Sequence, residues 1–331
     1  MAVASPARLR PMEGDASISD SDDESPSLPS RLSRTRLDLL GQEAGPAEAT
    51  ESYQFQTLPL EAQHALRAVI SDGADELDLF RSDVCDDHLE LISSLLRAGK
   101  SAGGGSGGGL LSTLSVANLG DNEIAARGAA AVAEAIAAAG APALRGLLLG
   151  RNRIGDEGCA AVAAALGGGA APELRELGLS VNAISCVGAT ALAAAPPAKL
   201  QRLYLARNQI SDAGAAALAA AVGRGALSEL QELWLASNRV GDAGLGALAR
   251  ALFAPGRGAR QLDLQANRIG DAGLADLAEF VRGDGEAEVE GAPTATNGSI
   301  GLVENRECTA AGKEALAAVA AAAAWRVVLR L

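Results

Sequence analysis

The chain has 331 residues, of which 48% are hydrophobic but only 2% are aromatic, so its interior must be built from Leu, Val, Ile and Ala. A formal net charge of −13 excludes the broad positive surface that attracts nucleic acid or anionic lipid nonspecifically. We therefore expect neither a nucleic-acid partner nor a membrane partner.

Residues 1–50 are rich in Ser, Pro and acidic residues without a sustained hydrophobic period, which predicts a disordered tail. Within it, acidic residues follow Ser19 and Ser21. This pattern suits an acid-directed kinase and makes both serines candidate phosphorylation sites. The alternative is a solvated acidic tail without modification. The N-terminus lacks the apolar core of a secretory signal, so the expected location is cytoplasmic.

Residues 51–73 are predicted to form an N-terminal capping helix, because the segment from Leu58 to Ile70 has helical apolar spacing with Pro59 near its start. Residues 74–331 are predicted to hold about eight sequence repeats. Two loop insertions interrupt them, a Gly-rich one at 99–109 and an acidic, polar one at 283–299. The Gly-rich loop lacks the residue order of a phosphate-binding loop.

The repeated motif is Leu-x-x-Leu-x-Leu-x-x-Asn-x-Ile, followed by Gly and an apolar helical stretch. It reads LRELGLSVNAI from Leu174, LQRLYLARNQI from Leu200 and LQELWLASNRV from Leu230. Its marker asparagine recurs every 26 to 30 residues, at Asn122, Asn152, Asn182, Asn208, Asn238 and Asn267. A unit of this size cannot bury its own apolar face, so consecutive units must stack.

In each unit the Leu-x-Leu pair alternates as a short strand does, and the Ala-rich stretch after it has helical spacing. Strands pack about 4.8 Å apart but helices need about 8–10 Å, so stacking one of each per repeat forces an arc. The predicted fold is an α/β right-handed solenoid, a horseshoe with a parallel sheet on its concave face and helices on its convex face.

Two polar positions of the repeat are predicted to be structural. The marker asparagine can satisfy buried backbone groups of neighbouring turns, since its side chain both donates and accepts. Aspartates such as Asp156 and Asp212 sit where a helix starts, and we expect them to accept the first free N–H groups of that helix.

Residues 74–331 resemble the ribonuclease-inhibitor type of leucine-rich repeat protein, whose unit is a strand and a full helix in about 28 residues. They are also similar to the leucine-rich repeat domains of NLR-type sensors and of the Ran GTPase-activating protein. The resemblance implies a non-catalytic protein-binding scaffold or adaptor that uses its concave surface.

Two other functions stay open at this point. One is a GTPase-activating protein of the Ran-activating type, because that activity is known on this fold, although none of that family's functional residues can be matched here. The other is a structural component of a ciliary or cytoskeletal assembly.

Candidate partner-binding residues stand between the repeat leucines. Tyr204 and Trp234 occupy the same place in consecutive repeats, so we expect them on adjacent strands within stacking reach, where exposed aromatics often form interface hot spots. An arginine row flanks them: Arg151, Arg153, Arg202, Arg207, Arg239 and Arg268. This row predicts a locally basic rim that suits a protein partner with an acidic or helical surface. The alternatives are two aromatics that only cover each other and a solvated arginine row.

The remaining chemistry-bearing residues predict no reaction. The cysteines Cys85, Cys159, Cys186 and Cys308 contain no Cys-x-x-Cys pair, and we expect them to be small core residues of a reducing compartment. His88 is the one histidine near a cysteine, three residues after Cys85, and no Ser/His/Asp or Cys/His arrangement is found outside the capping region. We therefore predict no catalytic residue, metal or cofactor, and a monomer.

Overall fold

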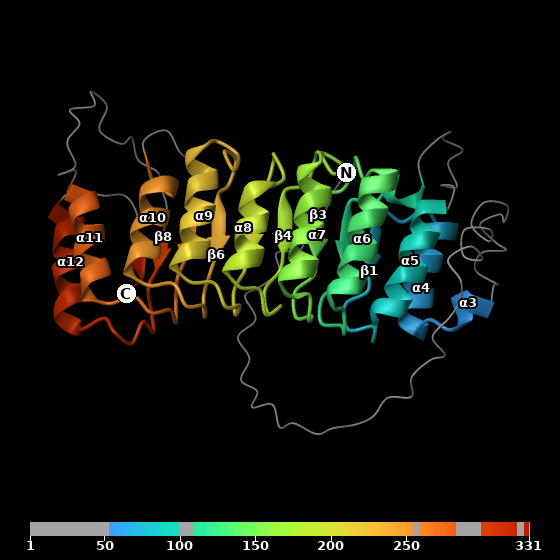
Figure 1. Cartoon of the computed structure of the whole chain (residues 1–331), viewed down its shortest axis with the longest axis horizontal. Coiled ribbons are helices and arrows are strands. Elements are labelled where there is room, and N and C mark those ends of the chain that lie inside the picture. Colours follow the sequence, from blue (N-terminus) through green and yellow to red (C-terminus); the bar gives the residue numbers. More distant parts are fainter. Residues whose placement is uncertain (1–52, 99–108, 255–257, 283–298, 323–327, 331) are drawn as a thin grey trace, which may run out of the picture.

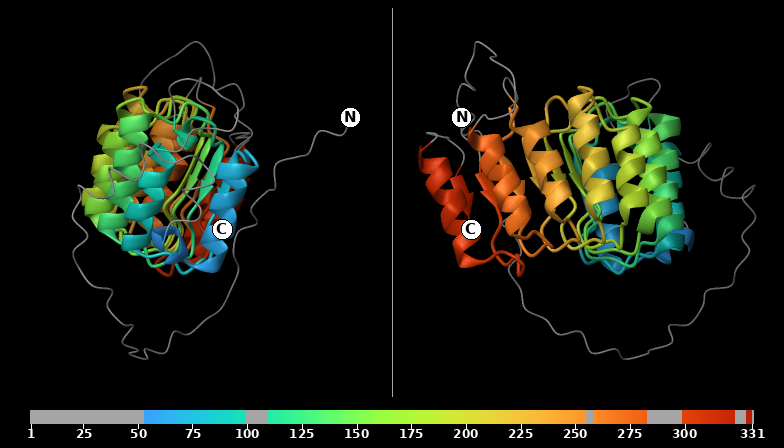
Figure 2. Two further views of the ribbon diagram at one scale, coloured as in Figure 1. Left: turned by 90° about the vertical axis from the view of Figure 1, so that its right-hand side faces the viewer. Right: turned by 60° about the vertical axis from the view of Figure 1, so that its left-hand side comes forward.

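The structure is a computed structural model that describes residues 53–98, 109–254, 258–282, 299–322 and 328–330. Within them, nine short strands lie in one parallel sheet whose spatial order follows the sequence from β1 to β9. Figure 1 shows the helices as a row in front of the strands, and Figure 2 shows that row on one side of the sheet. The fold is the predicted α/β right-handed solenoid. The tail 1–50 with Ser19 and Ser21, and the insertions over 99–108 and 283–298, lie outside the described residues.

Each repeat contributes one strand of three residues and one helix, and a ninth strand follows the last helix. The strands are β1 (Glu76–Asp78), β2 (Val116–Asn118), β3 (Gly146–Leu148), β4 (Glu176–Gly178), β5 (Arg202–Tyr204), β6 (Glu232–Trp234), β7 (Gln261–Asp263), β8 (Ser299–Gly301) and β9 (Val328–Arg330). The helices of the row are α5 (Asp86–Ala98), α6 (Ala126–Ala139), α7 (Gly155–Gly167), α8 (Cys186–Ala194), α9 (Asp212–Gly223), α10 (Asp242–Leu252), α11 (Asp271–Arg282) and α12 (Ala310–Ala322). A 3₁₀ turn, η1 (Leu110–Ser112), precedes β2.

The strand pattern places alternate residues on opposite faces of the sheet. The middle residue of each strand from β1 to β8 is buried between sheet and helices, as Leu203 and Leu233 are in β5 and β6. Because side chains alternate along a strand, the first and third residues face the concave surface.

A separate helical element covers the first strand. It consists of α3 (Tyr53–Gln56) and α4 (Leu60–Ser71), with Pro59 at the N-cap of α4. Phe55 and Leu66 are fully buried in the common core, and α4 packs against β1. Seen along the solenoid in Figure 2 (left), α4 lies beside the strands and does not continue the helix row.

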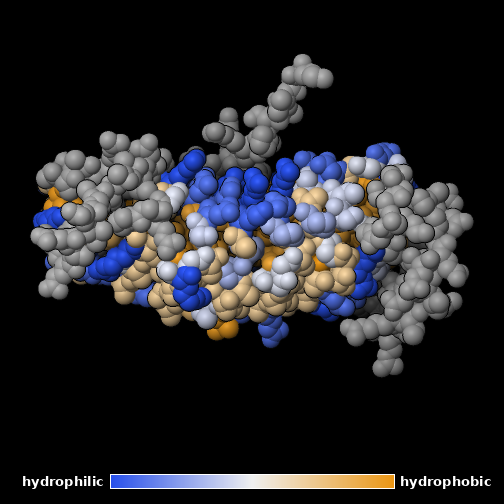
Figure 3. All heavy atoms as spheres, turned by 90° about the horizontal axis from the view of Figure 1, so that it is seen from above, coloured by the Kyte–Doolittle hydropathy of each residue, from blue (hydrophilic) through white to orange (hydrophobic). Residues whose placement is uncertain are grey.

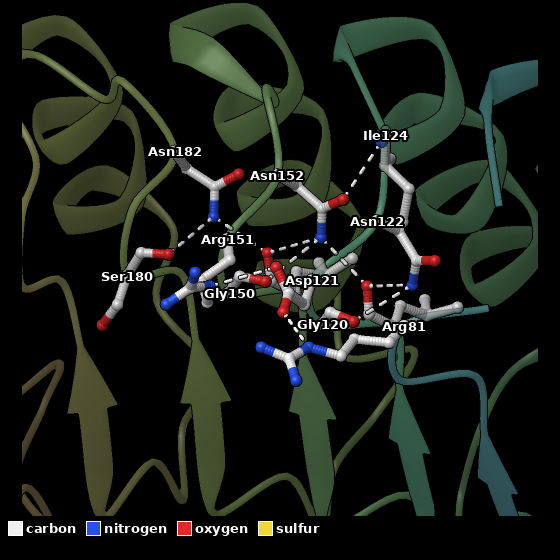
Figure 4. A network of polar contacts seen from close by, with 12 residues as sticks. Arg81, Gly120, Asp121, Asn122, Ile124, Gly150, Arg151, Asn152, Ser180 and Asn182 are labelled. Carbon is white, nitrogen blue, oxygen red and sulfur yellow. Dashed lines mark hydrogen bonds and ion pairs between the residues drawn. The ribbon is translucent and has the colours of Figure 1, made fainter. Parts of the chain in front are cut away.

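The marker asparagines form a continuous ladder inside the solenoid (Figure 4). Asn152 Oδ1 accepts a hydrogen bond of 3.0 Å from the N–H of Ile124 in the preceding repeat, and its Nδ2 donates to Leu119 O at 2.9 Å and Leu149 O at 3.0 Å. Equivalent bonds recur at Asn122, Asn182, Asn208, Asn238, Asn267 and Asn305. The prediction that these asparagines are structural is confirmed.

The aspartates at the helix starts cap the helix of the following repeat, not their own. Asp212 Oδ1 accepts from the N–H groups of Gly241 at 2.6 Å and Gly244 at 3.0 Å. The prediction of capping within one helix was wrong, because parallel stacking brings the next helix start beside each carboxylate. Glycine makes this approach possible, since a Cβ at Gly244 would lie 2.7 Å from that Asp212 oxygen.

The cysteines depart from their predicted core role. Only Cys159 is buried, and burial raises the pKa of its thiol to about 12. Cys85, Cys186 and Cys308 are partly exposed, because they lie at helix starts on the rim of the solenoid. Cys186 takes the capping place that aspartate holds in other repeats, and its Sγ lies 2.9 Å from Ser211 Oγ.

Candidate protein-binding surface

The two aromatic residues singled out in the sequence are neighbours on the concave face. Tyr204 of β5 pairs in register with Trp234 of β6, and both side chains are half-buried. Their ring centroids lie 6.0 Å apart with an interplanar angle of 33°. This separation is typical of interacting aromatic rings. The prediction that the two residues lie on adjacent strands within stacking reach is therefore confirmed.

The rings stand in the middle of a row of mostly small or buried residues. The third residues of β3 to β7 line up as Leu148, Gly178, Tyr204, Trp234 and Asp263. Gly178 has no side chain and Asp263 is only 5% exposed. Two positions further along the chain, Ser180, Ala206 and Ala236 are also small. A partner that reaches the concave floor at this point would therefore meet the aromatic pair first.

A line of alternating charge runs beside the pair at the first positions of β4, β5 and β6: Glu176, Arg202 and Glu232. Arg202 Nη2 lies 2.6 Å from Glu176 Oε2, while the indole Nε1 of Trp234 donates to Glu232 Oε2 at 3.3 Å. The two glutamates were not among the sequence candidates.

These carboxylates also act on Tyr204. Burial, followed by the negative charges of Glu176 and Glu232, raises the pKa of the Tyr204 hydroxyl. The phenol is therefore neutral at physiological pH.

The predicted arginine row divides into paired and unpaired members. Arg202 is bound by Glu176, and Arg151 Nε lies 3.0 Å from Asp121 Oδ1, whose other oxygen pairs with Arg81 (Figure 4). The other four are exposed and make no side-chain ion pair with any described residue: Arg153, Arg207, Arg239 and Arg268.

The backbone separates most of this row from the aromatic pair. Arg151 and Arg207 directly precede a marker asparagine and have positive φ values of 58° and 54°, in the left-handed region. All eight residues at this place share that conformation, with φ between 52° and 62°. Here the chain leaves the strand, so these arginines, with Arg153, Arg239 and Arg268 two residues later in the repeat, lie along what we term the strand-exit rim. Of the six predicted arginines, Arg202 alone lies in a strand beside the pair.

The surface differs in polarity between its two long sides. Figure 3 shows hydrophilic residues along one side of the molecule and mostly apolar residues along the other.

Among the residues that the structure describes, no group of three or more His, Cys, Asp and Glu side chains could hold a metal ion. No described helix has the length and hydropathy needed to span a bilayer.

A family model for leucine-rich repeats matches residues 144–163, 197–219, 228–249 and 260–278. Each match contains one strand, β3, β5, β6 or β7, and reaches into the helix after it. The chain contains leucine-rich repeats. No curated protein matches it. The aromatic pair occupies the second and third matched segments, so it lies on repeats that carry the family pattern.

Proposed function

We propose that this protein is a non-catalytic scaffold or adaptor that binds a protein partner on its concave surface, centred on Tyr204 and Trp234. The observation that carries the proposal is the half-buried aromatic pair with centroids 6.0 Å apart on adjacent concave strands. Large, rigid aromatic side chains supply contact area at low entropic cost and are enriched among interface hot spots.

The strand-exit rim supports a second contact zone for the same partner. Arg153, Arg207, Arg239 and Arg268 are exposed and lack ion-pair partners among the described residues. Acidic groups on the partner would meet cations there without breaking an existing pair. Such rim charges mainly steer association and select the partner, whereas the buried centre of an interface contributes most of the affinity.

We also propose that the repeats are of the ribonuclease-inhibitor type and that the protein acts as a cytoplasmic monomer. The helices of the row, 9 to 14 residues long, support the repeat type, because that subclass carries a full helix in each unit. The four free cysteines support a reducing compartment.

The proposal is tested by capture of partners from native lysate with the full chain as bait. The variant Tyr204→Ala/Trp234→Ala removes both rings, and we expect it to lose its specific partners, since each hot-spot aromatic is worth about 2 kcal/mol or more. The matched control is Val187→Ala on α8, which removes a side chain that is 68% exposed on the convex face. Equal capture by both variants and the parent chain would refute the proposal, provided circular dichroism shows that all three are folded.

A further inference from the structure

We infer that the aromatic pair receives a cationic side chain of the protein partner, an arginine, seated against Trp234 and the carboxylate of Glu232. This inference rests on the proposed binding at the concave face and adds the chemistry of the group that is bound there. It differs from the acidic partner surface that the arginine row suggests.

The charged residues beside the aromatic pair are two glutamates and one arginine, so one carboxylate is in excess. Arg202 stands between Glu176 and Glu232 in the sheet, but its guanidinium pairs with Glu176 at 2.6 Å. Glu232 makes no ion pair with any described residue, and its side chain accepts one hydrogen bond, from Trp234 Nε1 at 3.3 Å. An incoming cation would therefore meet a carboxylate that forms no direct ion pair with a described residue, although Arg202 is within electrostatic reach of it.

The rings add a second attraction for a cation. The indole N–H of Trp234 donates to Glu232, so the polar edge of that ring is already engaged. What remains for a partner is ring surface, which attracts a guanidinium or ammonium group over its face. Arginine suits this place best, because its planar group can stack on a ring while its N–H groups bind a carboxylate.

An anionic group would be disfavoured at the same place. It would approach the carboxylates of Glu176 and Glu232, and the one cation between them, Arg202, is already paired with Glu176. The nearest unpaired arginine along this strand is Arg207, three residues beyond Tyr204 on the strand-exit rim. β5 ends at Tyr204 and Arg207 has a φ of 54°, so this arginine belongs to the rim and not to the floor beside the pair. The floor and the rim thus present opposite charge to one partner.

The test uses the full chain with Trp325→Phe, which leaves Trp234 as its only tryptophan and therefore as the fluorescent reporter. The probes are N-acetyl-arginine amide, its neutral isostere N-acetyl-citrulline amide, and N-acetyl-glutamate amide, titrated to tens of millimolar at constant ionic strength. We expect a saturable change with the arginine probe alone.

Two charge variants give effects of opposite sign. Glu232→Gln removes the surplus carboxylate, and we expect it to weaken arginine binding about threefold. Arg202→Gln frees Glu176 for the probe, and we expect binding to tighten about twofold or more. The control Glu279→Gln, on the exposed part of α11, should leave binding unchanged.

The inference is overturned if no probe gives a saturable response, if citrulline equals arginine, or if glutamate binds and Arg202→Gln weakens it. None of these results bears on the proposed function. That function is tested separately, by whether the Tyr204→Ala/Trp234→Ala variant loses its protein partners. If the double variant loses its partners in lysate and the glutamate probe binds, the scaffold function stands. The group bound beside the aromatic pair would then be an anion and not a cation.

Discussion

Replacement of Asn208 by alanine should destabilise the solenoid more than any change at an exposed position of the same loop. Asn208 is 8% exposed and belongs to the repeat that carries Tyr204. Its Oδ1 accepts from the N–H groups of Asn182 and Ile184, both at 3.0 Å, and its Nδ2 donates to Leu179 O at 2.9 Å.

Alanine at this position leaves all three of those backbone groups without their side-chain partner. Each buried polar group that loses its partner costs about 1–3 kcal/mol, and the lower half of that range applies next to a rim that water can reach. The expected loss in free energy of unfolding is therefore about 3–6 kcal/mol. For a chain of this size that corresponds to a decrease in Tm of roughly 10 °C.

The assay is urea unfolding of the full chain followed by circular dichroism, together with amide hydrogen exchange of Ile184. The neighbouring exposed residue supplies the control, because Gln209→Ala should change the stability by no more than about 0.5 kcal/mol. A loss below about 1 kcal/mol for Asn208→Ala, or unchanged exchange at Ile184, would refute the role of the ladder in holding repeats together.

Three further results are expected. Cys186→Asp should raise stability by about 1 kcal/mol in urea unfolding, because a carboxylate there would cap the next helix as aspartate does in other repeats; destabilisation would contradict capping between repeats. Val181→Gly should raise the Tm, because a β-branched residue at φ 58° costs about 1–2 kcal/mol that glycine avoids, and an unchanged or lower Tm would speak against strain at this position. At pH 8, peptide mapping after iodoacetamide should find Cys186 alkylated well before Cys159. Burial raises the pKa of Cys159 to about 12. At Cys186 burial also acts to raise the pKa, but hydrogen bonds from Ser211 and Gly214 together lower it below its usual value. Earlier reaction of Cys159 would show that its burial is not maintained.

The fold could be predicted because the sequence pattern of one repeat determines its secondary structure. A fixed period, a Leu-x-Leu pair and a marker asparagine define strand, turn and helix in each unit, and stacking then follows from unburied apolar faces. The same reasoning placed Tyr204 and Trp234 side by side, because equal positions in consecutive repeats become neighbours in a parallel sheet. Local periodicity was sufficient for these features.

Features that depend on contacts between repeats were harder to predict. The direction in which Arg202 extends, toward Glu176, depends on side-chain conformation and is not encoded in the repeat period. The alternation of Glu176, Arg202 and Glu232 was nevertheless visible in aligned repeats, since all three hold the first strand position. Capping by Asp212 across repeats required the relative position of two helix starts, which depends on how the alanine-rich helices pack.

The central claim is that partners bind the concave floor beside the aromatic pair. The most direct measurement places the photo-crosslinking residue benzoylphenylalanine at Ala236, two residues after Trp234, and in a second protein at Ala216 on the convex helix α9. After irradiation in native lysate, mass spectrometry should find protein crosslinks from position 236 that are absent at position 216. Crosslinks to the same proteins from both positions, or from position 216 alone, would contradict the claim.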